Sequence, residues 1–80
     1  MIEKKVLINT IDKVTNFVFY FSAFAEGVTV RSGEITVDGK SILGLMSLDL
    51  SRVLTVYIEP IDEKSARRFE ACIEEFEVKE

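Results

Sequence analysis

The chain has 80 residues, of which 48% are hydrophobic, and a formal net charge of −4. This length predicts one domain with a single core, residues 1–80, and argues against additional catalytic subdomains. The acidic charge disfavours nucleic acid as a ligand, because phosphate binding depends on clustered Lys and Arg, and it favours a basic protein partner.

Signals for export or membrane insertion are missing from the sequence. It shows no basic leader with a small-residue cleavage site and no apolar stretch of about eighteen residues. We therefore expect a cytoplasmic protein with no membrane segment. A single cysteine excludes an internal disulfide. The oligomeric state is left open.

The first predicted strand covers residues 2–8, where β-branched residues are frequent. A helix is predicted next, with Thr10 or Asp12 as its N-cap, because apolar side chains recur at steps of three and four. Gly27 is predicted to end this helical segment. Its apolar face consists of Val14, Phe17, Val18, Phe21, Phe24 and Ala25.

Alternating apolar and polar side chains predict strands in the middle of the chain. Residues 28–38 predict a β-hairpin with a tight turn at Ser32 and Gly33. Residues 53–58 show the same alternation, and this strand is predicted to stop at Pro60, which has no N–H for sheet pairing.

Residues 41–48 are too short and too evenly apolar for periodicity to classify them. With Ser41 as N-cap, they predict a helix of two turns. This helix would turn one set of side chains to the sheet and the other outward. The inward set is Ile42, Leu45 and Leu48, and the outward set is Leu43 and Met46.

The last predicted helix is capped by Asp62 and carries one apolar stripe. The stripe consists of Ala66, Phe69, Cys72, Ile73 and Phe76. The element order is therefore β-α-β-β-α-β-α. Helices with one-sided apolarity and four strands predict an α+β fold, an open-faced β-sandwich with a four-stranded antiparallel sheet covered by helices on one face.

The chemistry available to this chain is narrow because it contains no histidine. The side chain best suited to proton transfer near neutral pH is therefore missing. Cys72 is predicted as core filler, without a base to activate it. We expect no catalytic residue, no metal site and no cofactor. The carboxylates of the last helix are interpreted as a solvated face: Glu70, Glu74, Glu75 and Glu77.

The aromatic run in the first helix has two interpretations. Phe17 and Phe21 fit on one helix face, but Phe19 and Tyr20 do not fit there as well. Either the last helix or residues 41–48 cover the additional rings, or the rings form a protein-contact patch.

The stretch GKSILGLMSLDLS, residues 39–51, is similar to the Lys-Ser-Ile-Met-Gly-Val-Met-Ser-Leu stretch of HPr. HPr is the histidine-containing phosphocarrier of the bacterial sugar phosphotransferase system. The resemblance extends over about residues 2–77 and is most specific at residues 40–48. It implies an HPr-like open-faced β-sandwich and a divergent member that lacks the active-site histidine.

The resemblance also implies that the phosphocarrier reaction is lost. In HPr proteins the first helix opens with Leu/Ile-His-Ala-Arg-Pro, and the histidine accepts phosphate from Enzyme I. Without gaps, Thr10 takes the place of that histidine, Asp12 that of the arginine and Lys13 that of the proline. A threonine cannot form the phosphoramidate, and Asp12 repels a phosphoryl group.

Ser41 aligns with the serine that HPr kinase/phosphorylase modifies in Gram-positive members, and a phosphate is electrostatically favoured at a helix N-cap. The resemblance therefore implies a non-catalytic regulatory or adaptor protein. Its partner would be HPr kinase/phosphorylase or a regulator, bound through the first helix and residues 41–48, with Ser41 as a phosphorylation switch. The predicted partner-binding residues are Thr10, Asp12, Lys40, Ile42, Leu43 and Met46.

Two alternatives stay open. The chain could be a phosphotransferase-system component that accepts phosphate at another residue, which labelling from phosphoenolpyruvate through Enzyme I would reveal. It could also be a small enzyme that uses carboxylates such as Asp12, Asp38 or Glu26, and this would require a deep polar pocket.

Overall fold

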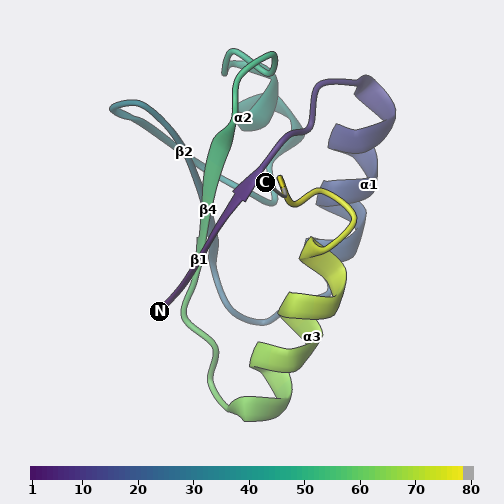
Figure 1. Cartoon of the computed structure of the whole chain (residues 1–80), viewed down its shortest axis with the longest axis vertical. Coiled ribbons are helices and arrows are strands. Elements are labelled where there is room, and N and C mark those ends of the chain that lie inside the picture. Colours follow the sequence, from purple (N-terminus) through teal and green to yellow (C-terminus); the bar gives the residue numbers. More distant parts are fainter. Residues whose placement is uncertain (79–80) are drawn as a thin grey trace.

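The computed structural model describes residues 1–78, so the last two residues of the predicted domain lie outside it. The described elements are β1 (Ile2–Val6), α1 (Ile11–Ser22), β2 (Val28–Ser32), β3 (Ile35–Asp38), α2 (Ile42–Met46), β4 (Leu54–Ile58) and α3 (Glu63–Ile73). This order confirms the predicted β-α-β-β-α-β-α arrangement (Figure 1).

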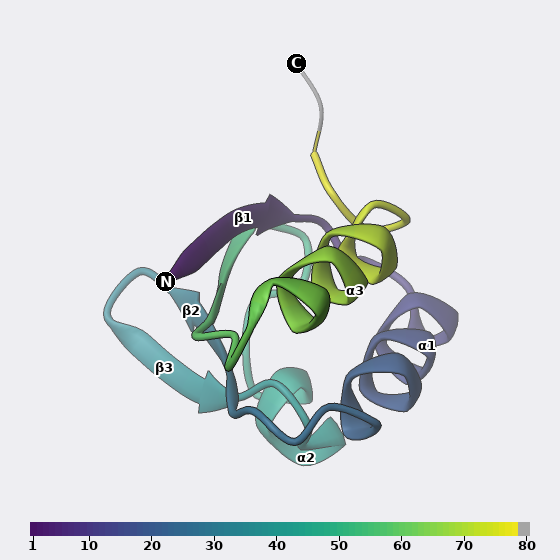
Figure 2. The same ribbon diagram turned by 90° about the horizontal axis from the view of Figure 1, so that it is seen from below.

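The strands form one antiparallel sheet in the order β1-β4-β2-β3. β4 lies inside the sheet, and its Val56 is opposite Lys4 of β1 and Val30 of β2. Figure 2 shows the helices on one face of the curved sheet and no element on the other. The open-faced sandwich is confirmed.

The core lies between the sheet and the helices. Alternate side chains of β2 and β4 face the helices and are fully buried, as expected for strands with one covered face. A cluster of phenylalanine rings fills the space above them. Phe21 lies at its centre, with ring centroids 4.6 Å from Phe17, 5.3 Å from Phe24 and 5.5 Å from Phe69. The buried strand residues are Val28, Val30, Leu54, Val56 and Ile58.

The hairpin turn lies one residue later than predicted. Ser32 pairs with Ile35, so the two loop residues are Gly33 and Glu34. Gly33 has a φ of 60° whereas Glu34 does not have a positive φ. This is the pattern of a type II′ turn, in which glycine is favoured at the first central position.

Strand β1 is shorter than the predicted residues 2–8, since its pairing with β4 ends at Val6 and Leu54. The Leu7 N–H donates to the carbonyl of Phe76 at 3.0 Å, and the Val78 N–H donates to the carbonyl of Lys5 at 2.8 Å. The outer edge of β1 is therefore paired with residues 76–78.

Helix α1 ends at Ser22, earlier than the predicted stop at Gly27. Ala25 lies beyond the helix and is exposed, so its place on the apolar face was predicted wrongly. Phe24 is buried although it lies past the helix end. The connection between α1 and β2 therefore belongs to the packed part of the molecule.

Helix α3 begins where it was predicted but ends at Ile73, so Phe76 of the predicted stripe lies beyond it. Its N-cap is Asp62, whose Oδ1 accepts from the Ser65 N–H at 2.7 Å. Phe69, Ile73 and Phe76 are buried, while Ala66 and Cys72 of the predicted stripe are half-buried. No helix within residues 1–78 is long and apolar enough to cross a membrane.

Gly39 closes the hairpin and approaches β2 closely, with its N–H 2.7 Å from the carbonyl of Val28. A Cβ at this position would lie 2.8 Å from Cγ1 of Val28 and 3.1 Å from Cγ2 of Val30. We therefore expect Gly39→Ala to lower the free energy of unfolding by about 1–3 kcal/mol, because the added methyl overpacks the contact. Urea denaturation monitored by circular dichroism measures the loss.

Gly27→Ala is the matched control, since a Cβ there has no atom within 4 Å. It should leave stability unchanged or raise it by up to about 1 kcal/mol through the unfolded state. Equal stability of the two alanine variants would contradict the close approach at Gly39.

Candidate functional site

The site begins at the N-terminus of α2, where Ser41 is the N-cap as predicted. Its Oγ accepts from the Gly44 N–H at 3.0 Å, and its own N–H donates to the carbonyl of Asp38 at 3.1 Å. The Ser41 side chain is half-buried. The hydroxyl therefore has a defined position and retains access to solvent.

Gly44 lets α2 lie close to the hairpin. A Cβ on Gly44 would be 3.3 Å from the Ser41 Oγ and 3.3 Å from the Val37 Cβ. A side chain here would crowd the capping hydroxyl and the strand beneath it. Gly44 therefore sets both the height of α2 above β3 and the free space around Ser41.

The apolar side chains of α2 and of Leu48, which follows it, divide into a buried and an exposed set. Leu45 is 0% exposed and Leu48 is 7% exposed. Leu43 is 84% exposed and Met46 is 44% exposed, which confirms that they face outward. Ile42 is 46% exposed, so its predicted anchoring role is wrong. As the first residue after the cap, it lies beside Leu43 on the surface and not under the helix.

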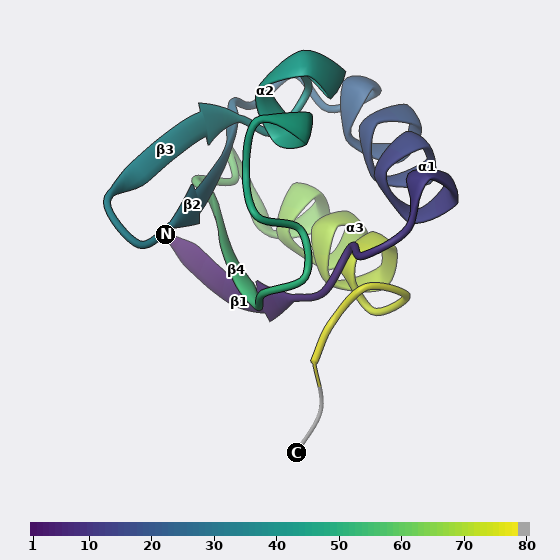
Figure 3. The same ribbon diagram turned by 90° about the horizontal axis from the view of Figure 1, so that it is seen from above.

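Lys40 does not stand free beside Ser41 but connects two parts of the chain. Its Nζ donates to the carbonyl of Phe24 at 2.5 Å, and its N–H donates to Oδ1 of Asp38 at 2.9 Å. The ammonium group therefore ties the start of α2 to the connection that follows α1. Figure 3 shows α2 beside α1, in agreement with the contacts between these helices.

The start of α1 carries the other predicted site residues. Thr10 is the N-cap, and its Oγ1 accepts from the Lys13 N–H at 3.1 Å. Asp12 lies in the first turn, so Thr10 and not Asp12 is the cap. Both side chains are exposed. Figure 1 places the start of α1 and helix α2 at the same end of the molecule, opposite to the start of α3.

Phe19 and Tyr20, the two aromatic residues of α1 outside its predicted apolar face, differ in their surroundings. The Tyr20 ring is half-buried, with its centroid 6.1 Å from that of Phe76. The negative charge of Glu75 raises the pKa of the Tyr20 hydroxyl above its ordinary value. Phe19 remains 75% exposed. The chain after α3 thus covers Tyr20, whereas Phe19 is free for contact.

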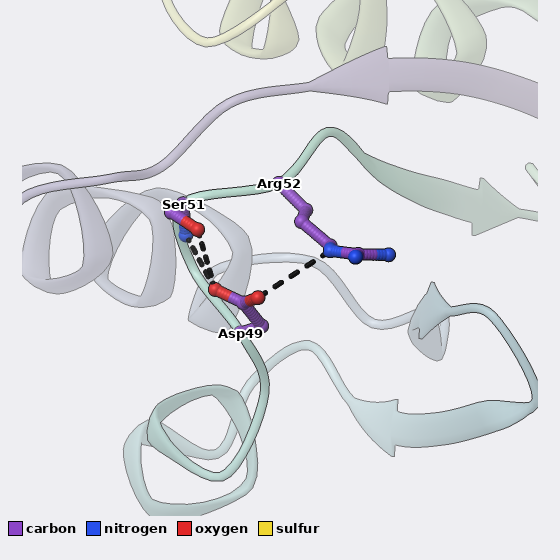
Figure 4. A network of polar contacts seen from close by, with 3 residues as sticks. All are labelled: Asp49, Ser51 and Arg52. Atoms are coloured by element: carbon purple, nitrogen blue, oxygen red, sulfur yellow. Dashed lines mark hydrogen bonds and ion pairs between the residues drawn. The ribbon is translucent and has the colours of Figure 1, made fainter.

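A polar loop leads from α2 into β4 (Figure 4). Oδ1 of Asp49 accepts from the Ser51 hydroxyl at 2.6 Å and from the Ser51 N–H at 3.1 Å, and its Oδ2 lies 3.4 Å from Nε of Arg52. Three interactions lower the pKa of Asp49 below its ordinary value. The largest is the hydrogen bond from the Ser51 hydroxyl, and the Ser51 N–H and the Arg52 charge add to it. This loop was not predicted from the sequence, although Asp commonly forms turns in which its side chain accepts from the N–H two residues on.

The acidic face of α3 is partly paired. Nζ of Lys4 lies 2.8 Å from Oε1 of Glu70 and 3.7 Å from Oε2 of Glu77, and the Glu70 hydrogen bond raises the Lys4 pKa. The predicted solvated face therefore holds at Glu70, whose side chain is 51% exposed, whereas Glu77 is half-buried and lies beyond the end of α3. Among the described residues there is no group of three His, Cys, Asp or Glu side chains that could hold a metal ion.

The carboxylates of the enzyme alternative are not brought together. Asp12 lies on α1, and Asp38 is exposed at the end of β3, where its Oδ1 accepts from the N–H of Lys40. Glu26 is buried in the connection before β2. These three carboxylates therefore do not form a pair for acid–base chemistry.

No family model matches this chain, and no curated protein matches it. Solved structures do. HPr-C-His from Thermoanaerobacter tengcongensis superimposes with a TM-score of 0.77 and 24% identity, over 95% of this chain and 91% of that chain. The phosphocarrier protein HPr from Bacillus anthracis superimposes with a TM-score of 0.69 and 23% identity, over 89% of this chain and 90% of that chain. The predicted HPr-like fold is confirmed.

Proposed function

We propose that this chain is a non-catalytic, HPr-like regulatory or adaptor protein of the sugar phosphotransferase system. It binds a protein partner through a docking face, and Ser41 is a phosphorylation switch at the edge of this face. The observation that carries the proposal is the 84% exposure of Leu43 two residues after a hydroxyl on an HPr-like fold. The docking face consists of Thr10, Asp12, Lys40, Ile42, Leu43 and Met46.

Three apolar side chains support a protein partner. Ile42, Leu43 and Met46 are all exposed on one short helix. Apolar surface costs free energy in water, and a contiguous exposed patch is typical of a protein contact. Leu45 and Leu48 already anchor α2 to the core, so the fold does not need the outward set for its own stability.

The missing histidine supports a role other than phosphate transfer. The chain has no imidazole at any position. Thr10, which the resemblance puts in the place of the HPr histidine, caps α1 through its hydroxyl. The Thr10 hydroxyl therefore has a structural task. Asp12 in the first turn adds a negative charge, which repels an incoming phosphoryl group.

The Ser41 hydroxyl supports a switch because it is ordered and reachable. It is held by the Gly44 N–H at 3.0 Å, and the neighbouring Ile42 and Leu43 side chains are exposed. A phosphate on Oγ would carry about two negative charges into the apolar docking face. Phosphorylation would therefore change which partner the face accepts.

Incubation with HPr kinase/phosphorylase and ATP is expected to add one phosphoryl group to the wild-type protein, measured by intact mass spectrometry. Ser41→Ala should take up none, whereas Ser47→Ala should be labelled like wild type. Leu43→Ala should be labelled more slowly at low protein concentration, because the kinase loses a docking contact. An HPr labelled in parallel is the positive control.

If wild type stays unlabelled while the HPr control is phosphorylated, the switch is refuted. Labelling of Ser41→Ala would place the modification elsewhere. Phosphoenolpyruvate with Enzyme I should leave the chain unlabelled, and transfer in that reaction would contradict the non-carrier role.

A further inference from the structure

Glu26 is a buried carboxylate in the connection between α1 and β2. It is 8% exposed, and its Oε2 accepts two hydrogen bonds from the segment at the start of α3. One donor is the Ser65 hydroxyl, and the other is the Ile61 N–H at 3.2 Å. These bonds join positions 35 and 39 residues apart in the sequence.

Ser65 is itself 5% exposed and lies in the first turn of α3. A surface hollow of about 250 Å³ lies beside the two residues. The charged side chains that line it with Glu26 come from α3 and its cap, and the remaining lining residues are uncharged. The charged groups are Asp62, Lys64 and Arg68, and the uncharged ones are Ala23, Ala25, Ile61 and Ser65.

The connection that carries Glu26 contacts both α3 and the residue before the cap of α2. The carbonyl of Phe24 accepts from Lys40 at the start of α2, and the Phe24 ring lies 4.6 Å from the guanidinium carbon of Arg68 on α3. Glu26 adds the hydrogen bonds to Ser65 and Ile61. Residues 24–26 thus tie the end of α1 to the starts of both other helices.

We propose that Glu26 is an acid-sensitive clasp, in which the ionised carboxylate fastens the connection after α1 to the first turn of α3 and protonation loosens that attachment. A carboxylate accepts stronger hydrogen bonds than a neutral carboxyl group, and its burial makes the acceptor hard for water to replace. This inference is independent of the proposed partner binding.

The titration of Glu26 supports the same direction. The Ser65 hydroxyl bond, followed by backbone N–H bonds and the Arg68 charge, lowers the pKa of Glu26 below its ordinary value of 4.5. A lowered pKa in the folded state means that the stabilisation is complete above pH 4.5 and is lost as the pH falls through the folded-state value.

Amide hydrogen exchange, expressed as protection factors, tests the clasp in the full chain. In wild type, the protection of the Ile61 and Ser65 amides should fall by about tenfold as the pH drops below the ordinary carboxyl value, while Val56 in β4 stays protected. Glu26→Gln should show the lower protection already at neutral pH and no acid transition. The control Glu59→Gln alters an exposed carboxylate before α3 and should behave like wild type.

Asp62 is a second carboxylate at this contact, because its Oδ1 accepts from the Ser65 N–H. Asp62→Asn keeps a capping oxygen and removes the charge, so the acid transition should persist in this variant. An acid transition that survives in Glu26→Gln and disappears in Asp62→Asn overturns the clasp.

Ser65→Ala provides a second reading if Glu26→Gln folds poorly. Without the hydroxyl, which is the largest cause of the lowered Glu26 pKa, the acid transition should move to higher pH. A transition at the unchanged pH would also overturn the proposal.

Discussion

Replacing Phe69 with alanine is expected to lower the free energy of unfolding by about 3–5 kcal/mol. Phe69 is 0% exposed, and its ring lies 5.5 Å from Phe21 and 6.5 Å from Phe24, centroid to centroid. Removing the ring leaves a cavity between α3, α1 and the connection that follows α1. Such a loss is a large share of the stability of a domain of this size.

Phe19→Ala is the matched control, because Phe19 is 75% exposed on α1. Its stability should stay within about 0.5 kcal/mol of wild type. Urea denaturation followed by circular dichroism gives both values. If both variants lose the same free energy, the assignment of Phe69 to the core and Phe19 to the surface is refuted.

Leu45→Ala is expected to cost about 2–5 kcal/mol, whereas Leu43→Ala should change the free energy of unfolding by less than about 0.5 kcal/mol. The two leucines lie two positions apart on α2, and their exposed fractions are 0% and 84%. The same chemical change therefore removes core packing at one position and only surface contact at the other.

Thermal unfolding of both variants at equal protein concentration separates these outcomes. A loss of more than 2 kcal/mol on Leu43→Ala would show that this side chain is enclosed, as in a self-associated form, and the docking face would not be free. Retained stability of Leu45→Ala would mean that α2 is not packed on the core through this residue.

Most of the fold could be predicted because the local patterns agree with the packing. The N-caps Thr10, Ser41 and Asp62 are confirmed, although Asp12 competed with Thr10 in the sequence. The stripe of α3 is buried at Phe69 and Ile73 because a 3.6-residue period places them on one face.

The errors lie where local pattern and tertiary contact compete. Moving the two-residue turn by one position shifts the strand register by two residues, so the same side chains still face the helices and the pattern does not distinguish the two turns. Strand β1 stops at Val6, where its pairing with β4 ends, and the next residue, Leu7, donates its N–H to the carbonyl of Phe76. A contact over this distance leaves no signal in the pattern around Leu7.

The positions of single residues in the candidate site were predicted better than the contacts between distant residues. The outward position of Leu43 and the capping role of Ser41 are confirmed. The attachment of Lys40 to Phe24 and the clasp at Glu26 were missed, since their partners lie 16 and 35 or more positions away. Glu26 was named only as a candidate catalytic carboxylate, because its burial depends on a segment that lies far away in the sequence.

The pairing of β1 has a consequence for synthesis on the ribosome. Both neighbours of this strand, β4 and residues 76–78, emerge after it, and in the sheet of the described residues β4 lies between β1 and the β2–β3 hairpin. Residues 2–6 therefore have no strand partner until residues 54–58 have left the exit tunnel. The sheet is thus completed late, which leaves the early chain dependent on its own solubility or on a chaperone.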